Sequence, residues 1–459
     1  MEIVGLFKPR KVQLVSLGCS KNRVDSEKLL SRLSDRDIEI IDESTPYNLS
    51  KPDVVVINTC GFIESAKQES INEIFKAIEA KQKGLVGKVV VCGCLSERYK
   101  GELGELIPEA DAIFGSFEWK QILEWMGLKT SSSALWKGRF LTTPRHYAYL
   151  KIADGCNRKC SYCAIPLIKG RYISVPLEQL VKEAELLAKS GVRELILIAQ
   201  DTTFYGMDLY KKRMLAPLLE ALSAIEGIEW IRIHYSYPTG FPMAVLEQIA
   251  SNPKICKYID IPLQHCSTSV LKSMRRATDF AKTQALIDKM RSTVPGVALR
   301  TTMIVGHPGE GKREFNQLLD FVRRNQFEML GAFEYSPEEG TYSCLNYKDS
   351  VPKAEKRRRY NAIMELQASI SLNNNKKRVG GVEKVLIDEY RDGMLIGRSQ
   401  RESPEVDGQI LIELPKGKNG KAPLDAHNLI GKFAAVLITE ALEYDLRGTL
   451  DIRLSATQG

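Results

Sequence analysis

Three cysteines stand close together in the middle of the chain at the spacing C-x3-C-x2-C: Cys156, Cys160 and Cys163. Three thiolates can grip one metal centre, but they do not complete the four-ligand set of a tetrahedral zinc site. A cubane iron–sulfur cluster also takes four ligands when it is fully coordinated. With three ligands, one iron keeps an open position for a substrate or cofactor, and this spacing predicts such a cluster.

Two other interpretations of these cysteines are a structural zinc site and a set of free thiols. Zinc sites usually come as paired C-x2-C units, and no second pair lies nearby in the sequence. Free thiols beside Arg158 and Lys159 would be easily oxidised. The spacing therefore favours the cluster with an open iron.

Three further cysteines each follow an apolar run that indicates a strand. Cys19 follows VQLVSLG, Cys60 follows VVVINT and Cys94 follows VVVCG. Ligands collect at the carboxyl ends of strands in open α/β sheets, so we expect these cysteines to meet and hold a second cluster. The alternative is that they are small core residues, which is the usual place of a lone cysteine.

A glycine adjoins each of these three cysteines and would let a bulky cofactor approach the backbone: Gly18, Gly61 and Gly93. Cys92 competes with Cys94, because residues two apart share one face of an extended strand. Cys92 falls within the apolar run and Cys94 follows the glycine turn, so we predict Cys94 as the ligand. The remaining cysteines are expected to be packing residues: Cys256, Cys266 and Cys344.

The elements that would position these cysteines fall into three domains, in keeping with the length of 459 residues. Residues 1–128 alternate apolar runs with amphipathic segments, which predicts an open α/β sheet with mostly parallel strands. Residues 129–146 have the composition of a linker. Residues 147–372 repeat a strand–helix rhythm, and residues 379–459 contain five short strand candidates.

Six strand candidates in the second domain predict an incomplete (β/α)6 barrel, short of the eight units of a full barrel. They are Tyr147–Ala153, Glu194–Ala199, Trp230–His234, Tyr258–Leu263, Val297–Val305 and Met329–Tyr335. Barrel chemistry sits where the strands end. The cysteine loop falls there, together with Gln200-Asp201-Thr202, Tyr235-Ser236, Gln264-His265, Gly306 to Glu310, and Ser336-Pro337-Glu338. An incomplete barrel also has an open side, which would admit a large substrate.

The third domain is predicted to be a small OB-like β-barrel. Ten basic and thirteen acidic residues give residues 379–459 a charge of −3. This balance disfavours a grip on RNA phosphates and favours a basic protein partner. The segment 352–378 carries eight basic and two acidic residues, and we expect a helix there with a solvated basic face.

The composition is that of a soluble globular protein, with 44% hydrophobic and 27% charged residues. No apolar run approaches the roughly 18 residues that a membrane span needs, and the first ten residues do not resemble a secretory signal. We therefore expect a cytoplasmic protein whose clustered cysteines serve metals rather than disulfides. The net charge of +8 permits contact with nucleic acid without requiring it.

The whole chain resembles the methylthiotransferases, a branch of the radical S-adenosylmethionine (SAM) enzymes. GCSKNRVDSE (Gly18 to Glu27) resembles the first motif of the family's cluster domain, and KIADGCNRKCSYCAIPLIKG (Lys151 to Gly170) resembles its radical-domain signature. The C-terminal module is similar to the TRAM domain. The resemblance implies an α/β chain with a central barrel of the radical SAM type.

Two branches of this family differ in their substrate. One modifies an adenosine derivative in tRNA, and the other modifies an aspartate of protein S twelve of the small ribosomal subunit. The GCSKN segment differs from the GCQMN-like form of the tRNA branch. Two further segments resemble the ribosomal-protein branch: DIPLQH (Asp260 to His265) and GRSQRESPEVDG (Gly397 to Gly408).

The resemblance implies two [4Fe–4S] clusters and SAM as cofactors. The radical cluster would be held by Cys156, Cys160 and Cys163, and the auxiliary cluster by Cys19, Cys60 and Cys94. Electron transfer from the first cluster to SAM would give a 5′-deoxyadenosyl radical that takes hydrogen from the aspartate β-carbon. The second cluster would present a methylated sulfur to that carbon, with a second SAM as methyl donor. Both open irons would then face one cavity between the first two domains.

The same resemblance implies the remaining site residues and partners. SAM would be contacted by Tyr162, Gln200 and Asp201, and no catalytic residue beyond the cluster ligands is expected. The partners would be the ribosomal protein, bound through the acidic TRAM-like domain, and an electron donor. Membrane contact is not expected, and the location near the ribosome permits contact with RNA.

Overall fold

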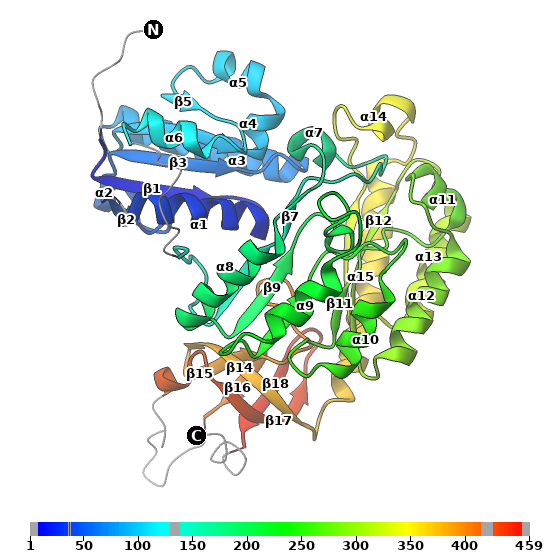
Figure 1. The fold of residues 1–459 in the computed structure, drawn as a ribbon. Helices are drawn as coiled ribbons and strands as arrows, with labels where there is room; N and C mark the ends of the chain where they lie inside the picture. Colours follow the sequence, from blue (N-terminus) through cyan, green and yellow to red (C-terminus); the bar gives the residue numbers. More distant parts are fainter. Residues whose placement is uncertain (1–7, 35, 37, 129–137, 415–425, 452–459) are drawn as a thin grey trace.

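The computed structural model describes residues 8–34, 36, 38–128, 138–414 and 426–451. Figure 1 shows a sheet domain at the N-terminus, a larger strand–helix domain in the middle and a small barrel at the C-terminus. The first nine residues of the predicted linker, 129–137, lie outside the described residues. In the described ranges, no helix has the length and apolar character needed to cross a membrane.

The N-terminal body is a parallel sheet with the strand order β2-β1-β3-β4-β5. Its strands are β1 (Lys11–Ser16), β2 (Glu39–Ile41), β3 (Val54–Thr59), β4 (Lys88–Gly93) and β5 (Ala112–Ile113). The buried central strands need helices on both faces of the sheet. One face packs with α1 (Ser20–Ser34) and α6 (Trp119–Trp125), and the other with α3 (Glu64–Gln82) and α5 (Lys100–Leu106). The predicted open α/β sheet is confirmed.

Six parallel strands run in chain order through the central body, in two sheets that a parallel bridge from Ile231 to Ile255 joins. They are β6 (Tyr147–Lys151), β9 (Glu194–Ile198), β10 (Trp230–Ile233), β11 (Tyr258–Asp260), β12 (Ala298–Val305) and β13 (Met329–Glu334). Each strand begins within one residue of its predicted start. The helices of this body include α8 (Leu177–Lys189), α9 (Leu215–Ser223), α10 (Met243–Ser251), α12 (Phe280–Thr293) and α13 (Lys312–Asn325). The incomplete barrel is confirmed.

The chain itself covers part of the inner face of this barrel. Val24 of α1 packs in one cluster with Tyr147 and Tyr149 of β6 and with Ile196 and Ile198 of β9. The alternate side chains of the same strands lie in the main core of the central body. Helix α1 therefore belongs to two cores at once, and it fixes the N-terminal body against the first barrel strands.

The C-terminal body is a closed barrel with the strand order β14-β15-β16-β18-β17. Its strands are β14 (Val382–Arg391), β15 (Met394–Arg398), β16 (Ile410–Glu413), β17 (Phe433–Ala441) and β18 (Leu446–Leu450). Alternate apolar residues of these strands fill its interior. The predicted five-stranded barrel is confirmed in the described part of the module.

The loop between β15 and β16, residues 399–408, leaves the small barrel and enters the central body. It contacts three side chains in or next to strands β10 and β11: Arg232 Nη1 donates to Gln400 O (2.7 Å), His234 Nε2 lies 2.8 Å from Ser403 Oγ, and Tyr258 Oη donates to Asp407 Oδ2 (2.7 Å). Glu405 reaches further and accepts bonds from Tyr147, Tyr149 and Arg23. One loop therefore ties all three bodies together.

Helix α15 (Lys353–Lys376) carries most of the basic residues of segment 352–378. The expected solvated basic face is wrong for two of them, because α15 packs on the edge strand β13. Lys356 and Arg359 are buried. The Lys356 ammonium donates to Tyr335 O (3.0 Å), and the Arg359 guanidinium donates to the Glu310 carboxylate (3.0 Å). These charges serve the interior of the fold and are not offered to a partner.

Candidate functional site

The C-x3-C-x2-C loop lies in the segment that connects two short, paired antiparallel strands, β7 (Ala153–Asp154) and β8 (Ile173–Ser174). Cys156 N donates to Gly170 O (3.1 Å) and closes the neck of the loop. Gly155 has φ +73°, and a Cβ there would lie 2.1 Å from Arg171 O. Only glycine fits where residue 155 passes the backbone of Arg171. The strand pair and Gly155 together therefore fold the loop back on itself.

Two cations and two tyrosines lie in and beside this loop, and the sulfur that they approach is that of Cys160. Arg276 donates to Tyr162 Oη (3.1 Å) and lies 3.9 Å from Cys160 Sγ. Tyr237 Oη lies 4.0 Å from the same sulfur, and Arg158 and Arg276 both stack on the Tyr237 ring. Positive charge beside the sulfurs would stabilise their anionic, metal-bound form.

The three sulfurs share one environment. Burial raises the pKa of Cys156 to about 11, and the charges of Asp201 and Cys160 add to this shift. Burial also raises the pKa of Cys163, and both Cys160 and Cys156 add to it. These two groups are therefore neutral thiols near pH 7, and they would release protons on binding a metal.

The second set of cysteines lies at the carboxyl edge of the N-terminal sheet. The carbonyl of Cys19 accepts the first helical bond of α1, from Arg23 N (3.1 Å). Cys60 directly follows β3, and Cys94 is the first residue of α4 (Cys94–Arg98), which follows β4. Because these strands are neighbours and parallel, the three cysteines lie along one edge of the sheet, and their meeting in one cluster stays a prediction.

Asn22, inside the GCSKN segment, links the loops that carry the three cysteines. Its amide nitrogen donates to Thr59 O (2.9 Å) and Leu17 O (3.2 Å), and its oxygen accepts from Cys94 Sγ (3.3 Å). It is buried. Sequence reasoning did not single out Asn22, although the motif that contains it was recognised.

The glycines beside these cysteines have a different use from the one expected. A Cβ on Gly18 would lie 2.6 Å from Cys60 Cβ, and a Cβ on Gly61 would lie 2.8 Å from Leu95 Cα. The glycines thus let the cysteine loops pack directly on one another. This close approach is between protein segments, whereas the sequence suggested an approach to a cofactor.

Cys92 and Cys94 point into different surroundings, as the sequence predicted. Gly93 has φ +99° and ends β4 between them. Cys92 lies in the core that α1 and α6 form with the sheet. Cys94 instead packs with Ala164 and Ile168 of the central body.

That last contact joins the two cysteine sets. Ala164 directly follows Cys163, and Ile168 lies on α7 (Ile165–Lys169). A buried charge network runs along the same boundary: Asp25 of α1 pairs with Lys151 and Lys169, and Asp154 pairs with Lys151. The two sets therefore lie on opposite sides of one domain boundary.

The residues predicted to contact SAM lie in or beside the loop. Two of them already have hydrogen-bond partners among the described residues, and the third has one acceptor atom without such a partner. Asp201 is committed to Arg158 Nε (2.7 Å) and Thr203 Oγ1 (2.5 Å), and Tyr162 accepts from Arg276. Gln200 Oε1 is a buried acceptor with no partner among the described groups. Burial would raise the pKa of Asp154, but Lys151, Lys169 and a hydrogen bond from Gln200 hold it below its ordinary value.

Sequence reasoning missed Arg276 and Tyr237. Both lie in irregular segments after β11 and β10, and their contacts with Cys160 arise only when the strands assemble. Tyr237 follows the Tyr235-Ser236 strand end by one residue, which was the signal available for it. Nothing in the spacing around Arg276 indicates its place.

The three cysteines expected to be packing residues divide into two groups. Cys256 and Cys266 are buried in hydrophobic cores. Cys344 is half-buried on α14 (Tyr342–Asn346), and its packing role stays a prediction.

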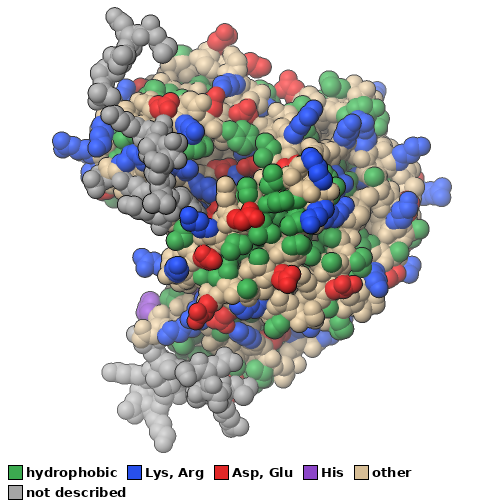
Figure 2. All heavy atoms as spheres, viewed as in Figure 1, with side chains coloured by type: hydrophobic (Ala, Val, Ile, Leu, Met, Phe, Trp, Pro, Cys, Tyr) green, Lys and Arg blue, Asp and Glu red, His purple; other side chains and the backbone are tan. Residues whose placement is uncertain are grey.

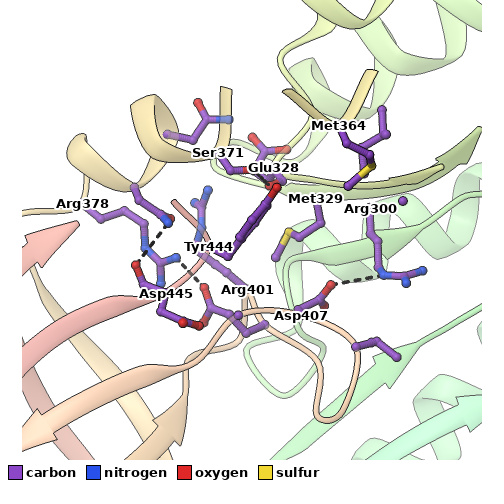
Figure 3. Close-up of a pocket in the computed structure, with 17 residues that line it drawn as sticks. Arg300, Glu328, Met329, Met364, Ser371, Arg378, Arg401, Asp407, Tyr444 and Asp445 are labelled. Carbon is purple, nitrogen blue, oxygen red and sulfur yellow. Dashed lines mark hydrogen bonds and ion pairs between the residues drawn. The ribbon is translucent and has the colours of Figure 1, made fainter. Parts of the chain in front are cut away.

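A cavity of about 420 Å³ lies away from both cysteine sets, at the seam between the central body and the C-terminal barrel (Figure 3). Its walls include Arg300, Met329, Asp407 and Tyr444. Asp407 faces Arg300 across the seam (3.2 Å), and Asp407 also accepts from Ser403 N. The polar groups of this cavity thus hold the loop 399–408 in place.

Part of the acidic charge of the C-terminal module is paired inside the chain. Five of its acids pair with cations or His146: Glu383 and Glu402 with Arg378, Asp388 with Arg398 and His146, Glu405 with Arg23, and Asp407 with Arg300. On the face in Figure 2, basic and acidic side chains are interspersed. The formal charge of −3 therefore does not describe the surface that this module offers to a partner.

Three family models match successive parts of the chain. Residues 11–115 match the Uncharacterized protein family UPF0004, residues 150–322 match the Radical SAM superfamily, and residues 379–450 match the TRAM domain. The solved structure of the radical SAM methyltransferase TsrM from Kitasatospora setae has a TM-score of 0.52 at 15% identity, over 84% of this chain and 81% of that one. This likeness shows a shared fold.

Curated relatives match along nearly the whole chain. The ribosomal protein uS12 methylthiotransferase RimO of Flavobacterium johnsoniae is 51% identical over 442 residues, which are 96% of this chain and 98% of that protein. RimO of Cytophaga hutchinsonii is 49% identical over 440 residues, again 96% and 98%. With the three domains in the same order, the chain belongs to the radical SAM family of RimO-type ribosomal protein uS12 methylthiotransferases.

Proposed function

We propose that the two cysteine sets each hold one [4Fe–4S] cluster and that the pair forms a single methylthiolation site. The contact of Cys94 with Ala164, next to Cys163, is the observation that carries this proposal. Three cysteines at C-x3-C-x2-C spacing, with no second C-x2-C pair nearby, favour a cluster over zinc at the first set.

The residues around the first set fit a radical cluster with SAM. Gln200 Oε1 is a buried acceptor without a partner in the described residues, and it suits the ammonium group of the SAM methionine part. Asp201 would act through Arg158, which it fixes beside the loop. Tyr162 is held by Arg276 and would pack at the edge of the cofactor.

When bound, the clusters and SAM supply a radical that removes hydrogen from an unactivated carbon, a sulfur atom and a methyl group. The chain's own residues orient these groups and set their charge. Arg276 stabilises anionic sulfur at Cys160, and Asn22 holds the loops of the second set together. The ion pairs of Lys151 and Lys169 with Asp25 hold the two cysteine sets in a fixed position relative to each other across the boundary.

The substrate we propose is the aspartate of uS12, modified at its β-carbon. Relatives named as uS12 methylthiotransferases support this choice over the adenosine of tRNA. Contact of the TRAM-like barrel with RNA near the ribosome is compatible with the proposal. The electron donor is an external partner, because the cysteines assigned to the clusters provide no source of electrons.

Mass spectrometry of both substrates tests the proposal. A strain lacking the gene should have unmodified uS12 and unchanged tRNA, and the wild-type gene should restore the methylthio group on the uS12 aspartate. A Cys160→Ala gene should fail to restore it. Loss of a methylthio group from tRNA with uS12 unchanged would contradict the proposed substrate, and full restoration by Cys160→Ala would contradict the proposed chemistry.

A further inference from the structure

Lys21, on the first turn of α1, crosses from the N-terminal body to the central body. Its ammonium lies 3.1 Å from the centroid of the Tyr235 ring, and only 8% of the residue is exposed. No hydrogen bond or ion pair links this ammonium to any residue that the structure describes. A buried ammonium that faces an aromatic ring and makes no hydrogen bond lacks the oxygen acceptors it prefers.

The other buried or half-buried cations near the cysteines have oxygen partners. Lys151 and Lys169 pair with Asp25, Arg158 pairs with Asp201, and Arg276 donates to Tyr162 Oη and Pro262 O. Further along α1, Arg23 pairs with Glu405 and Lys28 with Glu183. Among Lys21 and these cations, Lys21 is the one whose ammonium has no described oxygen partner and can bind an added anion.

Lys21 and Tyr235 meet at the domain boundary, and each is close in sequence to a residue at one cysteine set. Lys21 follows Cys19 by two residues, and Tyr235 precedes Tyr237, whose hydroxyl lies 4.0 Å from Cys160 Sγ, by two residues. An anion at the Lys21 ammonium would therefore sit at the boundary that both sets face.

The backbone of Tyr235 is held in an uncommon conformation that supports this placement. Its φ is +58°, in the left-handed region that a tyrosine rarely adopts. Tyr235 N donates to Asp260 Oδ2 (2.9 Å), and Tyr235 O accepts from Thr202 N (3.1 Å). Strain of this kind persists where the surroundings fix it, commonly at ligand sites. Here it sets the ring under the ammonium.

We propose that the Lys21 ammonium binds the side-chain carboxylate of the substrate aspartate and that Tyr235 positions it. This inference rests on the proposed function, in which the reacting carbon carries that carboxylate. A charge-assisted hydrogen bond to an ammonium in a dry site favours a carboxylate strongly over a neutral amide. Lys21 is thus a specificity-determining residue that selects aspartate over asparagine.

The test measures binding of uS12 to the cluster-loaded enzyme with SAM present, under anaerobic conditions. Two forms of uS12 are used, one with its target aspartate and one with asparagine in that position. Wild-type enzyme should bind the aspartate form at least about tenfold more tightly. Lys21→Gln should lose this preference because its affinity for the aspartate form alone falls. Lys21→Arg should keep most of the preference.

The matched control is Lys28→Gln, on the same helix, whose ammonium crosses the same boundary but already pairs with Glu183 of α8. It should keep the full preference for aspartate. Iron content and SAM cleavage without uS12 should be equal in all variants, which separates a binding role from a folding role. A Lys21→Gln enzyme that loses iron would assign Lys21 to cluster assembly and overturn the inference.

Failure of the inference and failure of the proposed function give different results. If wild-type enzyme binds neither form of uS12, the proposed substrate is wrong and the inference falls with it. If wild-type enzyme binds both forms equally, or if Lys21→Gln keeps the wild-type preference, only the role of Lys21 is overturned.

Discussion

Glu310 is a buried carboxylate whose ionisation opposes the fold. It is 2% exposed and lies between His265 Nε2 (3.8 Å) and Arg359 Nη1 (3.0 Å), with Gly306 N donating to it (2.6 Å). Burial raises its pKa from 4.5 to about 7, and Arg359 offsets only part of that effect. A raised carboxyl pKa stabilises the folded state at low pH, and this contribution disappears as pH rises through the folded pKa.

Replacing Glu310 by glutamine should remove this pH dependence. In the wild type, the free energy of unfolding should lose about 3 kcal/mol from this group between about pH 4.5 and pH 8. Burial lowers the pKa of His265 to about 3 and that of His307 to about 4, which gives an opposite trend common to both proteins. Denaturant unfolding across this range should show the Gln variant gaining stability relative to wild type as pH rises. Parallel curves would show that Glu310 does not titrate there.

Residue types and spacing single out six cysteines, whose role as cluster ligands stays a prediction, and they separate Cys94 from Cys92. The separation follows from local chain chemistry, because a glycine turn ends one strand between the two. Arg276 and Asn22 could not be predicted in this way. Their partners lie on other strands and loops, so their contacts depend on how the strands assemble.

At the scale of elements, the glycines beside the cysteines set how closely the loops of the second set approach. A Cβ on Gly61 would lie 2.8 Å from Leu95 Cα and 2.9 Å from Cys94 O. Both are backbone atoms, which cannot move without shifting the start of α4. The packing of these loops is therefore sensitive to a single methyl group.

Gly61→Ala should disrupt the second cluster and spare the first. We expect reconstituted iron to fall by about four per chain, one cubane, while SAM cleavage without uS12 continues. Gly104→Ala is the control, since a Cβ at this position in helix α5 meets nothing within 4 Å. It should keep full iron content and gain up to about 1 kcal/mol of stability. Equal iron in both variants would contradict the packing argument.

Strand positions were predictable because buried parallel strands appear as short apolar runs between polar turns. The loop 399–408 was not predictable as a structural link, since it has no periodicity and its partners lie in two other domains. The charge of α15 was misjudged for the same reason. Lys356 and Arg359 look like surface residues until β13 and the loop after β12 supply their partners.

For the whole molecule, the proposed two-cluster site requires the three bodies to meet around one domain boundary. Cys19 directly precedes helix α1, and Lys21, Arg23 and Asp25 lie in its first six residues. Their side chains serve the second cysteine set, the Tyr235 site, the loop 399–408 and the network with Lys151. The order of domains was predictable from the motifs. The use of the acidic residues of the C-terminal module inside the chain was not, because a formal charge does not say which acids are paired.

Iron content after anaerobic reconstitution tests the central claim most directly. The wild-type chain should bind about eight irons, four for each cubane. A Cys60→Ala/Cys94→Ala chain should bind about four and still cleave SAM, and a Cys156→Ala/Cys160→Ala chain should bind about four and lose cleavage. A wild-type plateau near four irons, with both cysteine sets intact, would contradict the two-cluster site.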